Sequence, residues 1–372
     1  MEQICNINNC TGCGVCFNIC PKKCISMVED EFGFLYPNID IESCVDCGLC
    51  KKFCPANTDV QYSEPENVYA AINKNDIDYA TTTSGGIATL FSRNIIEKNG
   101  VVYGAGFVDG FKVKHLRSET QADIEKIKGS KYVQSTTADM LDALKKDLEY
   151  GRDVLFVGTP CQVAGVKSYV EKDYPNLVLC DLVCHGVPSS KMLKEHLNCI
   201  GDADKVEKIS FRDKQGFYLT VFDKDCVIYR KRNFKDVFYL GFLKSLFYRD
   251  CCYLCKYARS ERVSDITLGD FWGFDNEKGE FPYPTVNGLS LVMINTEKGR
   301  RFFESCKEHM IFVERTVQEA VAGNKQLRFP SIMHKNRNKF LRNYLLKGFK
   351  KATNSALWKE RIIYGILDMI GK

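Results

Sequence analysis

The sequence predicts a mixed α/β protein, with α+β insertions, that carries a small cysteine-rich domain at its N-terminus and a helical tail at its C-terminus. Three observations support this fold class. A cysteine motif occurs twice before residue 60, apolar strand-like runs alternate with helical patterns between residues 68 and 330, and basic residues with helically spaced apolar positions follow residue 331. Strands that alternate with helices are typical of a sheet covered by helices on both faces.

The chain is long enough for several domains. Its 372 residues exceed what one hydrophobic core normally serves, so we expect two or three domains. We place them at residues 1–60, at residues 68–330 (an N-terminal part 68–150 and a C-terminal part 151–330) and at residues 331–372. A polar stretch with Pro55 and Pro65 marks the first boundary.

The composition indicates the cellular compartment of the protein and the role of its cysteines. A hydrophobic content of 45% and a charged content of 27% describe a soluble globular chain. No run approaches the roughly 20 apolar residues of a membrane span, and no signal-peptide core precedes Cys10, so we expect a cytoplasmic protein. Because disulfides do not persist in a reducing compartment, the 19 cysteines indicate metal and redox use.

The repeated cysteine motif predicts two iron-sulfur clusters. Residues 10–21 and residues 44–55 each read CxxCxxCxxxCP. In this pattern three cysteines on one loop ligate a [4Fe-4S] cluster, and the fourth ligates the other cluster. A zinc site or a disulfide framework fits less well, because zinc sites usually close with paired CxxC motifs and need no crossed ligand. We therefore assign Cys10, Cys13, Cys16 and Cys54 to one cluster and Cys44, Cys47, Cys50 and Cys20 to the second, in a ferredoxin-like domain.

Behind this domain the patterns predict strands and helices in turn. A helix follows Ser84-Gly85-Gly86, and further helices are expected at residues 139–149 and 161–170. Buried strands are expected at residues 101–105, 154–157 and 177–183, an antiparallel insertion at 208–230 and an aromatic-rich helix at 237–248. We expect a largely parallel sheet whose active edge lies at the carboxyl ends of its strands.

Charge is unevenly distributed along the chain. Residues 1–60 carry eight acidic and four basic side chains, a balance of −4, and residues 331–372 carry ten Lys or Arg against Glu360 and Asp368, a balance of +8. This asymmetry predicts separate docking faces. For the tail, peripheral contact with a membrane surface and an ordinary solvated face both stay open. We expect no nucleic-acid partner.

The sequence also contains a turn suited to a phosphate group. One-electron centres are useful to an enzyme when they are coupled to a flavin, which handles electrons singly and in pairs. Ser84-Gly85-Gly86 opens a helix, whose free N–H groups and positive dipole end favour an anion. Neither GxGxxG nor GxxxxGK[ST] occurs, so a Rossmann or P-loop site is not supported.

Six motifs in order carry a family resemblance. They are SGGIATLF, KGSKYVQS, VGTPCQVAG, LVCHGVPS, the CxxC at Cys252 and Cys255, and SDITLGDFWG. Together they resemble the beta subunit of the coenzyme F420 hydrogenase/dehydrogenase family over roughly residues 68 to 310. The resemblance implies an FAD-containing oxidoreductase that passes electrons between iron-sulfur clusters and a two-electron acceptor.

The resemblance also implies which residues bind the flavin and act in catalysis. Lys131 offsets phosphate charge or donates toward the reduced ring, and His185 shuttles a proton, although a lone loop histidine more often only satisfies local hydrogen bonds. Asp270 and Trp272 are candidates for the wall of the flavin site, with a capping Asp and a core Trp as the competing interpretation. The cofactor-binding set is Ser84, Gly85, Gly86, Gly129, Ser130, Lys131, Tyr132, Gly158, Thr159, Asp270 and Trp272.

A third [4Fe-4S] cluster is implied beside the flavin. Its expected ligands are Cys161, Cys184, Cys252 and Cys255, with Cys251 able to replace Cys252. Cys161 could instead be a thiol activated at a helix N-terminus. Four other cysteines are expected to be small buried hydrophobic residues: Cys180, Cys199, Cys226 and Cys306.

These expectations give two functions of different classes. In the first, an enzyme takes electrons from a reduced ferredoxin or another redox protein and reduces a small-molecule acceptor, which is F420-like or linked to surface-polysaccharide biosynthesis. In the second, the chain is a non-catalytic electron-relay subunit that docks on a partner enzyme. The sequence leaves the direction of electron flow and a homo-oligomeric state open.

Overall fold

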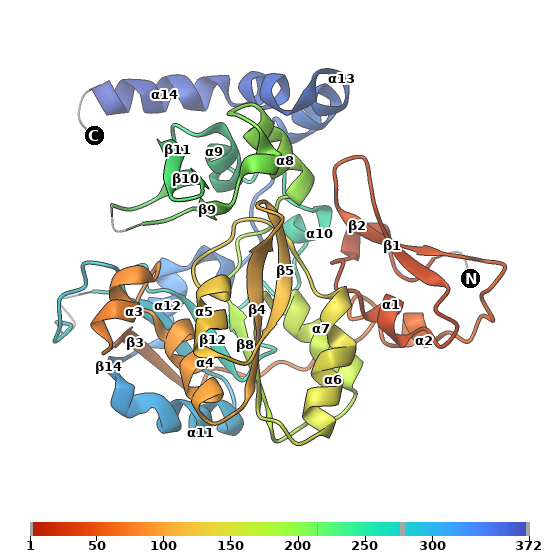
Figure 1. The fold of residues 1–372 in the computed structure, drawn as a ribbon, viewed down its shortest axis with the longest axis vertical. Coiled ribbons are helices and arrows are strands. Elements are labelled where there is room, and N and C mark those ends of the chain that lie inside the picture. Colours follow the sequence, from red (N-terminus) through yellow and green to blue (C-terminus); the bar gives the residue numbers. More distant parts are fainter. Residues whose placement is uncertain (1–2, 214, 276–279, 370–372) are drawn as a thin grey trace.

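The computed structural model describes residues 3–213, 215–275 and 280–369, and Figure 1 shows a small N-terminal head beside a larger body. The head contains the short 3-10 helix η1 (Ile7–Asn9), α1 (Val15–Ile19), the antiparallel strands β1 (Ile25–Glu29) and β2 (Leu35–Ile39), and α2 (Leu49–Lys52). Each cysteine loop therefore runs into one short helix, as expected for a ferredoxin-like domain with two equivalent halves.

The body is organised around a nine-stranded mixed sheet with the order β14-β3-β13-β12-β8-β7-β4-β5-β6. In chain order the strands are β3 (Asn67–Asn73), β4 (Val101–Val108), β5 (Lys112–Ser118), β6 (Ser135–Thr136), β7 (Val154–Gly158), β8 (Leu177–Leu182), β12 (Ile266–Asp270), β13 (Ser290–Ile294) and β14 (Met310–Arg315). The mixed α/β class and the C-terminal helices predicted from the sequence are confirmed.

The expectation of a largely parallel sheet is correct only for its centre. There β12, β8, β7 and β4 lie side by side and run parallel. On one side β13, β3 and β14 are added antiparallel, and on the other side β5 pairs antiparallel with β4. The β4–β5 hairpin turns at Asp109-Gly110, where both residues have positive φ. Such a dipeptide is a strong hairpin signal, and it favours the antiparallel return found here.

Helices cover both faces of the sheet. The helices of the body are α3 (Asp76–Thr81), α4 (Ile87–Glu97), α5 (Gln121–Ile127), α6 (Leu141–Glu149), α7 (Pro160–Val170), α8 (Ser190–Asn198), α9 (Val237–Leu243), α10 (Asp250–Tyr253), α11 (Glu297–Cys306), α12 (Val317–Gly323), α13 (Arg337–Ala356) and α14 (Trp358–Met369). Alternate residues of β4 face opposite ways, so Val101 packs with α6 and α7 while Val102 packs with α4 and α11.

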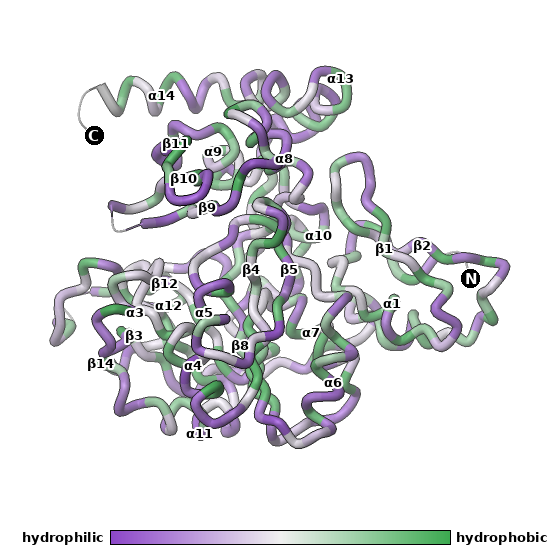
Figure 2. Tube along the Cα trace, viewed as in Figure 1, coloured by the Kyte–Doolittle hydropathy of each residue, from purple (hydrophilic) through white to green (hydrophobic). Residues whose placement is uncertain are grey.

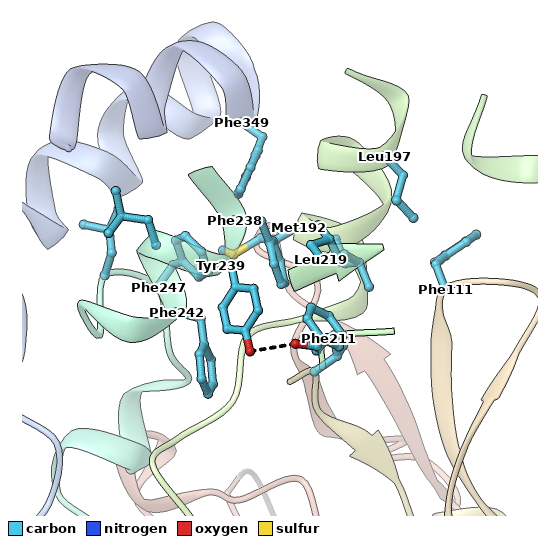
Figure 3. Close-up of a cluster of buried hydrophobic side chains, with 14 of the residues drawn as sticks. Phe111, Met192, Leu197, Phe211, Leu219, Phe238, Tyr239, Phe242, Phe247 and Phe349 are labelled. Atoms are coloured by element: carbon cyan, nitrogen blue, oxygen red, sulfur yellow. Dashed lines mark hydrogen bonds between the residues drawn. The ribbon is translucent and has the colours of Figure 1, made fainter. Parts of the chain in front are cut away.

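A third layer closes the carboxyl edge of the sheet. It contains the antiparallel sheet β11-β10-β9, with β9 (Lys208–Ser210), β10 (Tyr218–Asp223) and β11 (Cys226–Arg232), and the helices α8, α9 and α13. Figure 3 shows Phe238, Phe247 and Phe349 converging in its core, where Tyr239 Oη donates to the Phe211 carbonyl at 2.9 Å. The antiparallel insertion is thus present, whereas the helix expected over 237–248 ends at Leu243.

The two C-terminal helices differ in burial. Phe340, Tyr344 and Phe349 anchor α13 in the core of the third layer. By contrast α14 leaves Trp358, Ile362 and others about half exposed, and hydrophobic and hydrophilic positions alternate along it in Figure 2. Among the described residues, no helix combines the length and hydropathy needed to cross a membrane.

The two cysteine loops of the head differ in how they pack around their glycines. Gly14 and Gly48 occupy equivalent positions, each with a left-handed backbone before its helix. A Cβ on Gly14 would lie 2.6 Å from the Cβ of Ala138, whereas a Cβ on Gly48 would meet nothing within 4 Å. The Asn18 amide, one turn further on, donates to the Ala138 carbonyl at 2.8 Å. The first cysteine loop is therefore closely packed on the body at Gly14, while the end of the second loop contacts it at Phe53, whose carbonyl accepts from Ser168 Oγ at 2.6 Å.

This difference gives a paired prediction. Gly14→Ala and Gly48→Ala both force alanine into the left-handed region, which costs roughly 1–2 kcal/mol. Only Gly14→Ala also overpacks the head against Ala138, which adds roughly 1–3 kcal/mol. We expect anaerobic denaturant unfolding to give a larger loss of unfolding free energy for Gly14→Ala. Equal losses in the two variants would contradict this docking.

Candidate functional site

Four cysteines surround a small cavity in the head. The cavity is lined by Cys10, Cys13, Cys16 and Cys54, so the fourth cysteine of the second run lies with three cysteines of the first. Cys5 lies beside this set, and its hydrogen bond to the Cys10 sulfur lowers the pKa of Cys10 to about 6. Its hydrogen bond to Cys54 lowers the pKa of that thiol to about 7. The structure therefore brings the predicted first ligand set together.

The second set gathers in the same crossed manner. Burial raises the pKa of Cys50, and the nearby Cys47 and Cys20 raise it further. Cys20 Sγ lies 3.4 Å from Cys24 Sγ, and Cys44 is a further neighbour of Cys24. Cys47 is exposed. Cys20, from the first run, thus lies with the cysteines of the second run, and Cys20 and Cys50 are buried.

The spacing of these sulfurs suits a cluster better than a single ion. Among residues 3–213, 215–275 and 280–369, no three His, Cys, Asp or Glu side chains converge tightly enough to hold one metal ion. Zinc at about 2.3 Å from each sulfur would need such tight convergence. Cys10, Cys13, Cys16 and Cys54 line one cavity together, and four cysteines in this crossed pattern are the ligands that a [4Fe-4S] cluster takes. The donor sets of the head fit that group.

A second, much larger cavity of about 530 Å³ lies at the carboxyl edge of the parallel strands. Its volume falls within the range of cofactor and ligand sites. Strand β7 is followed here by Thr159, β8 by Cys184, and β12 ends here at Asp270. Thr11 and Gly12 of the head form part of the same wall. The site therefore lies where the sequence placed the active edge, and it reaches the first cysteine loop.

Five thiols line this cavity. They are Cys161, Cys184, Cys251, Cys252 and Cys255. Burial raises the pKa of Cys184 to about 12, and Cys255 and Cys251 contribute to the rise. Burial also raises the pKa of Cys161, with Cys251, Cys255 and Cys184 as nearby thiols. The structure brings all the predicted ligands of a third cluster together and leaves both Cys251 and Cys252 as candidates.

The remaining cysteines divide into two groups. Cys180 and Cys306 are fully buried, as expected. Cys199 and Cys226 are exposed, so the expectation that they are buried was wrong. Cys226 begins β11, whose residues Val227 and Ile228 are also exposed. Cys226 is exposed because β11 is an edge strand of the small sheet.

The glycine-rich turn borders the large cavity through two of its three residues. Ser84 and Gly86 line the cavity, and Gly86 precedes α4 without any side-chain cap. The first N–H groups of α4 therefore stay available to an anion at this end. Gly85 is not among the lining residues, and its Cβ would lie 2.2 Å from the Ala71 carbonyl oxygen. Gly85 is thus required for close packing against β3.

Gly129, Ser130, Lys131 and Tyr132 also line the cavity, and Ser130 Oγ lies 3.1 Å from Thr83 Oγ1 beside the glycine-rich turn. Lys131 Nζ donates to the carbonyls of Ile127, Lys128 and Gly129 at 2.7, 2.8 and 3.0 Å. No carboxylate pairs with it in the described part of the chain, and burial lowers its pKa to about 7. By contrast Lys128 pairs with Asp78 at 3.1 Å. Lys131 thus lines the cavity with its ammonium on three backbone carbonyls and with no carboxylate to offset its charge among the described residues.

Asp270 and Trp272 form the wall near the third layer. Arg212 Nη1 donates to Asp270 Oδ2 at 2.7 Å, and its guanidinium lies 4.3 Å from the Phe217 ring and 5.8 Å from the Trp272 ring. Trp272 is 43% exposed, so it is not a core tryptophan. Sequence reasoning missed Arg212, because its approach to Asp270 depends on how the antiparallel insertion folds over the sheet.

Two histidines line the cavity in different states. His185 is accessible but largely enclosed, and this burial lowers its pKa. His115 is buried, stacks on Phe156 with ring centroids 4.9 Å apart, and lies 3.0 Å from the Val157 carbonyl and 3.1 Å from Ser135 Oγ. Burial lowers the pKa of His115 to about 4. Sequence reasoning missed His115, which lies on a strand with no motif around it.

The cysteine-lined head and the cofactor-sized cavity at a sheet edge define an electron-transfer iron-sulfur protein. Residues 9–58 match the 4Fe-4S dicluster domain, and residues 151–320 match the family described as the C terminus of the coenzyme F420 hydrogenase/dehydrogenase beta subunit. The chain is therefore similar to a 4Fe-4S dicluster domain near its N-terminus and to this oxidoreductase family over residues 151–320. The resemblance drawn from the six sequence motifs is confirmed.

A solved structure shares the fold. It belongs to the F420-reducing [NiFe] hydrogenase complex from Methanosarcina barkeri, with 18% sequence identity and a TM-score of 0.50. The similarity covers 76% of this chain and 94% of that chain. No curated protein matches the chain.

The crossed arrangement in the head predicts the outcome of single cysteine substitutions. Cys54→Ser should remove about four irons, because one cubane loses a ligand. Anaerobic alkylation with peptide mapping should then label Cys10, Cys13 and Cys16 and leave Cys44, Cys47 and Cys50 protected. Cys5→Ser, which changes a neighbouring thiol outside the motif, should keep the full iron content. Labelling of the second run instead would show that each run binds its own cluster.

Proposed function

We propose that this protein is an iron-sulfur flavoprotein oxidoreductase. It takes single electrons from a reduced ferredoxin or another redox protein and delivers a pair to a small-molecule acceptor through FAD. The observation that carries the proposal is the composition of one cavity, which is bordered by the first cysteine loop of the head, by five thiols and by the predicted flavin loops.

A third [4Fe-4S] cluster would be held at this sheet edge. Cys161 follows β7 and Cys184 follows β8, while Cys252 and Cys255 come from α10 and the residues after it. Thiols that are all buried together are difficult to ionise, because burial raises their pKa values. Bound iron removes this cost, since a coordinating thiol is deprotonated by the metal. The donor set therefore fits a cluster.

FAD would lie between this thiol group and the third layer. The uncapped start of α4 and the Lys131 ammonium supply positive charge for its phosphates. When bound, the flavin couples one-electron to two-electron transfer. The chain supplies a largely enclosed site for it, in which Asp270 is held by Arg212 and His185 is available as a proton carrier. Lys131 and His185 are the proposed catalytic residues.

The electron donor would dock on the exposed face of the head. Cys47 is exposed there, whereas Cys13 is in contact with the body through Gly165. The head also carries the acidic balance of the chain, which favours a partner with a basic docking face. In the tail, three apolar side chains beside basic residues are about half exposed: Trp358, Ile362 and Ile366. Peripheral contact of the tail with a membrane and self-association of the protein therefore stay predictions.

The acceptor is proposed only as a class. An F420-like deazaflavin or a small molecule linked to surface-polysaccharide biosynthesis would meet Arg212, Asp270 and Trp272 at the wall of the cavity. If the protein is instead a non-catalytic electron-relay subunit, it converts no acceptor unless a partner enzyme is present. Oxidation of reduced deazaflavin by the isolated protein would therefore exclude the relay.

Cofactor counting tests the proposal directly. Three cubanes require about twelve irons per chain, whereas the head alone requires about eight. We expect anaerobically purified protein to contain about twelve irons and to release one FAD per chain on heating. About eight irons and no flavin would contradict the proposal and leave an electron relay through the head.

Lys131→Met should weaken flavin binding about tenfold, because a neutral side chain no longer offsets phosphate charge. The pH dependence has a defined sign. Lys131 is charged in the empty cavity below its pKa of about 7, and a bound phosphate raises this pKa. The affinity it contributes is therefore complete below pH 7 and is lost as pH rises through the higher bound-state value.

Flavin titration of the apoprotein from pH 6 to pH 9 measures this effect. Lys126→Met is the matched control, because Lys126 lies near Lys131 in the chain, at the end of α5, is 66% exposed and pairs with Asp123. Its affinity and pH profile should equal those of the unmodified protein. A Lys131→Met protein with the unmodified pH profile would show that this lysine does not face the flavin phosphates.

A further inference from the structure

Arg249 is a fully buried arginine between the head and the large cavity. It precedes α10, and its backbone N–H donates to the Val187 carbonyl. Its Nε donates to the Cys10 carbonyl at 2.7 Å and its Nη2 to the Leu35 carbonyl at 2.9 Å. Nη2 also lies 3.6 Å from Cys10 Sγ. One side chain of the body thus holds both the backbone and the sulfur of the first cysteine of the head.

The guanidinium makes no ion pair with an acidic side chain in the part of the protein that the structure describes. The Tyr36 and Phe34 rings lie 4.0 and 5.6 Å from its centre, and Gln134 Oε1 accepts from Nη1 at 3.4 Å. No ion pair joins Arg249 to an Asp or Glu of the described chain, and the adjacent Asp250 pairs with Arg337. Burying an unpaired charge costs several kcal/mol. The geometry therefore requires a negative group that the amino acids alone do not supply.

Thiolates lie on both sides of this charge. Cys10 belongs to the first ligand set of the head, while Cys251 and Cys252 belong to the five thiols of the large cavity. Arg249 interacts electrostatically with all three, and it lines the large cavity itself. A cluster ligated on either side carries negative charge, and each one-electron reduction adds one more. The guanidinium is placed to offset that added charge.

We propose that Arg249 is the counter-charge shared by the cluster that Cys10 ligates and the cluster proposed at Cys251 or Cys252. By favouring the reduced form, it raises the reduction potential of both and keeps the two potentials close. Arg249 is a positioning residue in this role. The part that concerns the second of these clusters depends on the proposed function.

The test is an EPR-monitored redox titration of anaerobic, full-length protein. For Arg249→Gln we expect the ratio of reduced to oxidised cluster at a fixed ambient potential to fall about tenfold at the Cys10 centre. For a one-electron couple this corresponds to 59 mV. The Cys44 centre should keep its potential, because the described contacts of Arg249 include Cys10 and none of the cysteines of the second set. Its signal is assigned from Cys20→Ser protein, which lacks that centre. Arg249→Lys, which keeps the charge, should recover most of the shift.

A second variant leaves Arg249 in place. Gln134→Glu puts a carboxylate where Gln134 Oε1 now accepts from Nη1, so it neutralises the guanidinium and should lower the same potential even where Arg249→Gln fails to assemble. Arg117→Gln, at an arginine paired with Asp147, is the control and should change neither potential. Equal shifts at the Cys10 and Cys44 centres, or no shift in Gln134→Glu, would overturn the proposal.

The readout separates the two proposals. Protein with only eight irons would disprove the third cluster, yet Arg249→Gln would still have to lower the potential of the Cys10 centre. Protein with twelve irons and an unchanged Cys10 potential would disprove the role of Arg249 alone. A lower potential in Arg249→Gln that Arg249→Lys fails to recover would indicate a packing effect and would also count against the proposal.

Discussion

The fixed contact between the first cysteine loop and the body is the constraint on which the rest of the site depends. Thr137 Oγ1 donates to the Cys13 carbonyl at 2.9 Å, and Gln134 Nε2 donates to the Thr11 carbonyl at 3.0 Å. A Cβ on Gly165 of α7 would lie 3.0 Å from the Cβ of Cys13. Since Thr11 also borders the large cavity, any movement of the head would open that cavity. The iron-sulfur module is therefore a structural wall of the site as well as an electron carrier.

This contact makes two equal halves of a sequence repeat unequal. The motif is the same at Cys10 and at Cys44, and Gly14 and Gly48 have nearly the same backbone conformation. Gly14 packs closely against Ala138 of the body, whereas Gly48 has no neighbour within 4 Å of a Cβ, and Cys47 of the second ligand set is exposed. The two cysteine loops have the same motif but different surroundings. Docking on the body, and not the local sequence, therefore distinguishes the two predicted cluster sites.

Local sequence patterns predict some residues of the site, whereas residues placed by long-range packing are missed. Thr159, Cys184 and Asp270 could be placed at one edge because each follows or ends a strand, and the carboxyl ends of parallel strands meet. Arg249, His115 and Arg212 could not be placed, because their roles come from long-range packing that no local pattern records. The antiparallel pairing of β5 with β4 could be predicted only in part. Asp109-Gly110 is a local signal for a hairpin turn, but no local pattern gives the position of that hairpin within the sheet.

A buried ion pair shows why the cysteine segments meet at all. Arg262 Nη2 lies 3.0 Å from Asp181 Oδ2, and both side chains are almost completely buried. Arg262 Nη1 also donates to the Tyr257 carbonyl, so the pair ties the segment after Cys255 to the strand that precedes Cys184. Apolar residues of similar volume would often be as stable as such a pair. They would not fix the relative position of two segments, however, since hydrophobic contact is not directional. The charges therefore contribute position more than stability, and they hold the segment after Cys255 beside the strand that leads to Cys184.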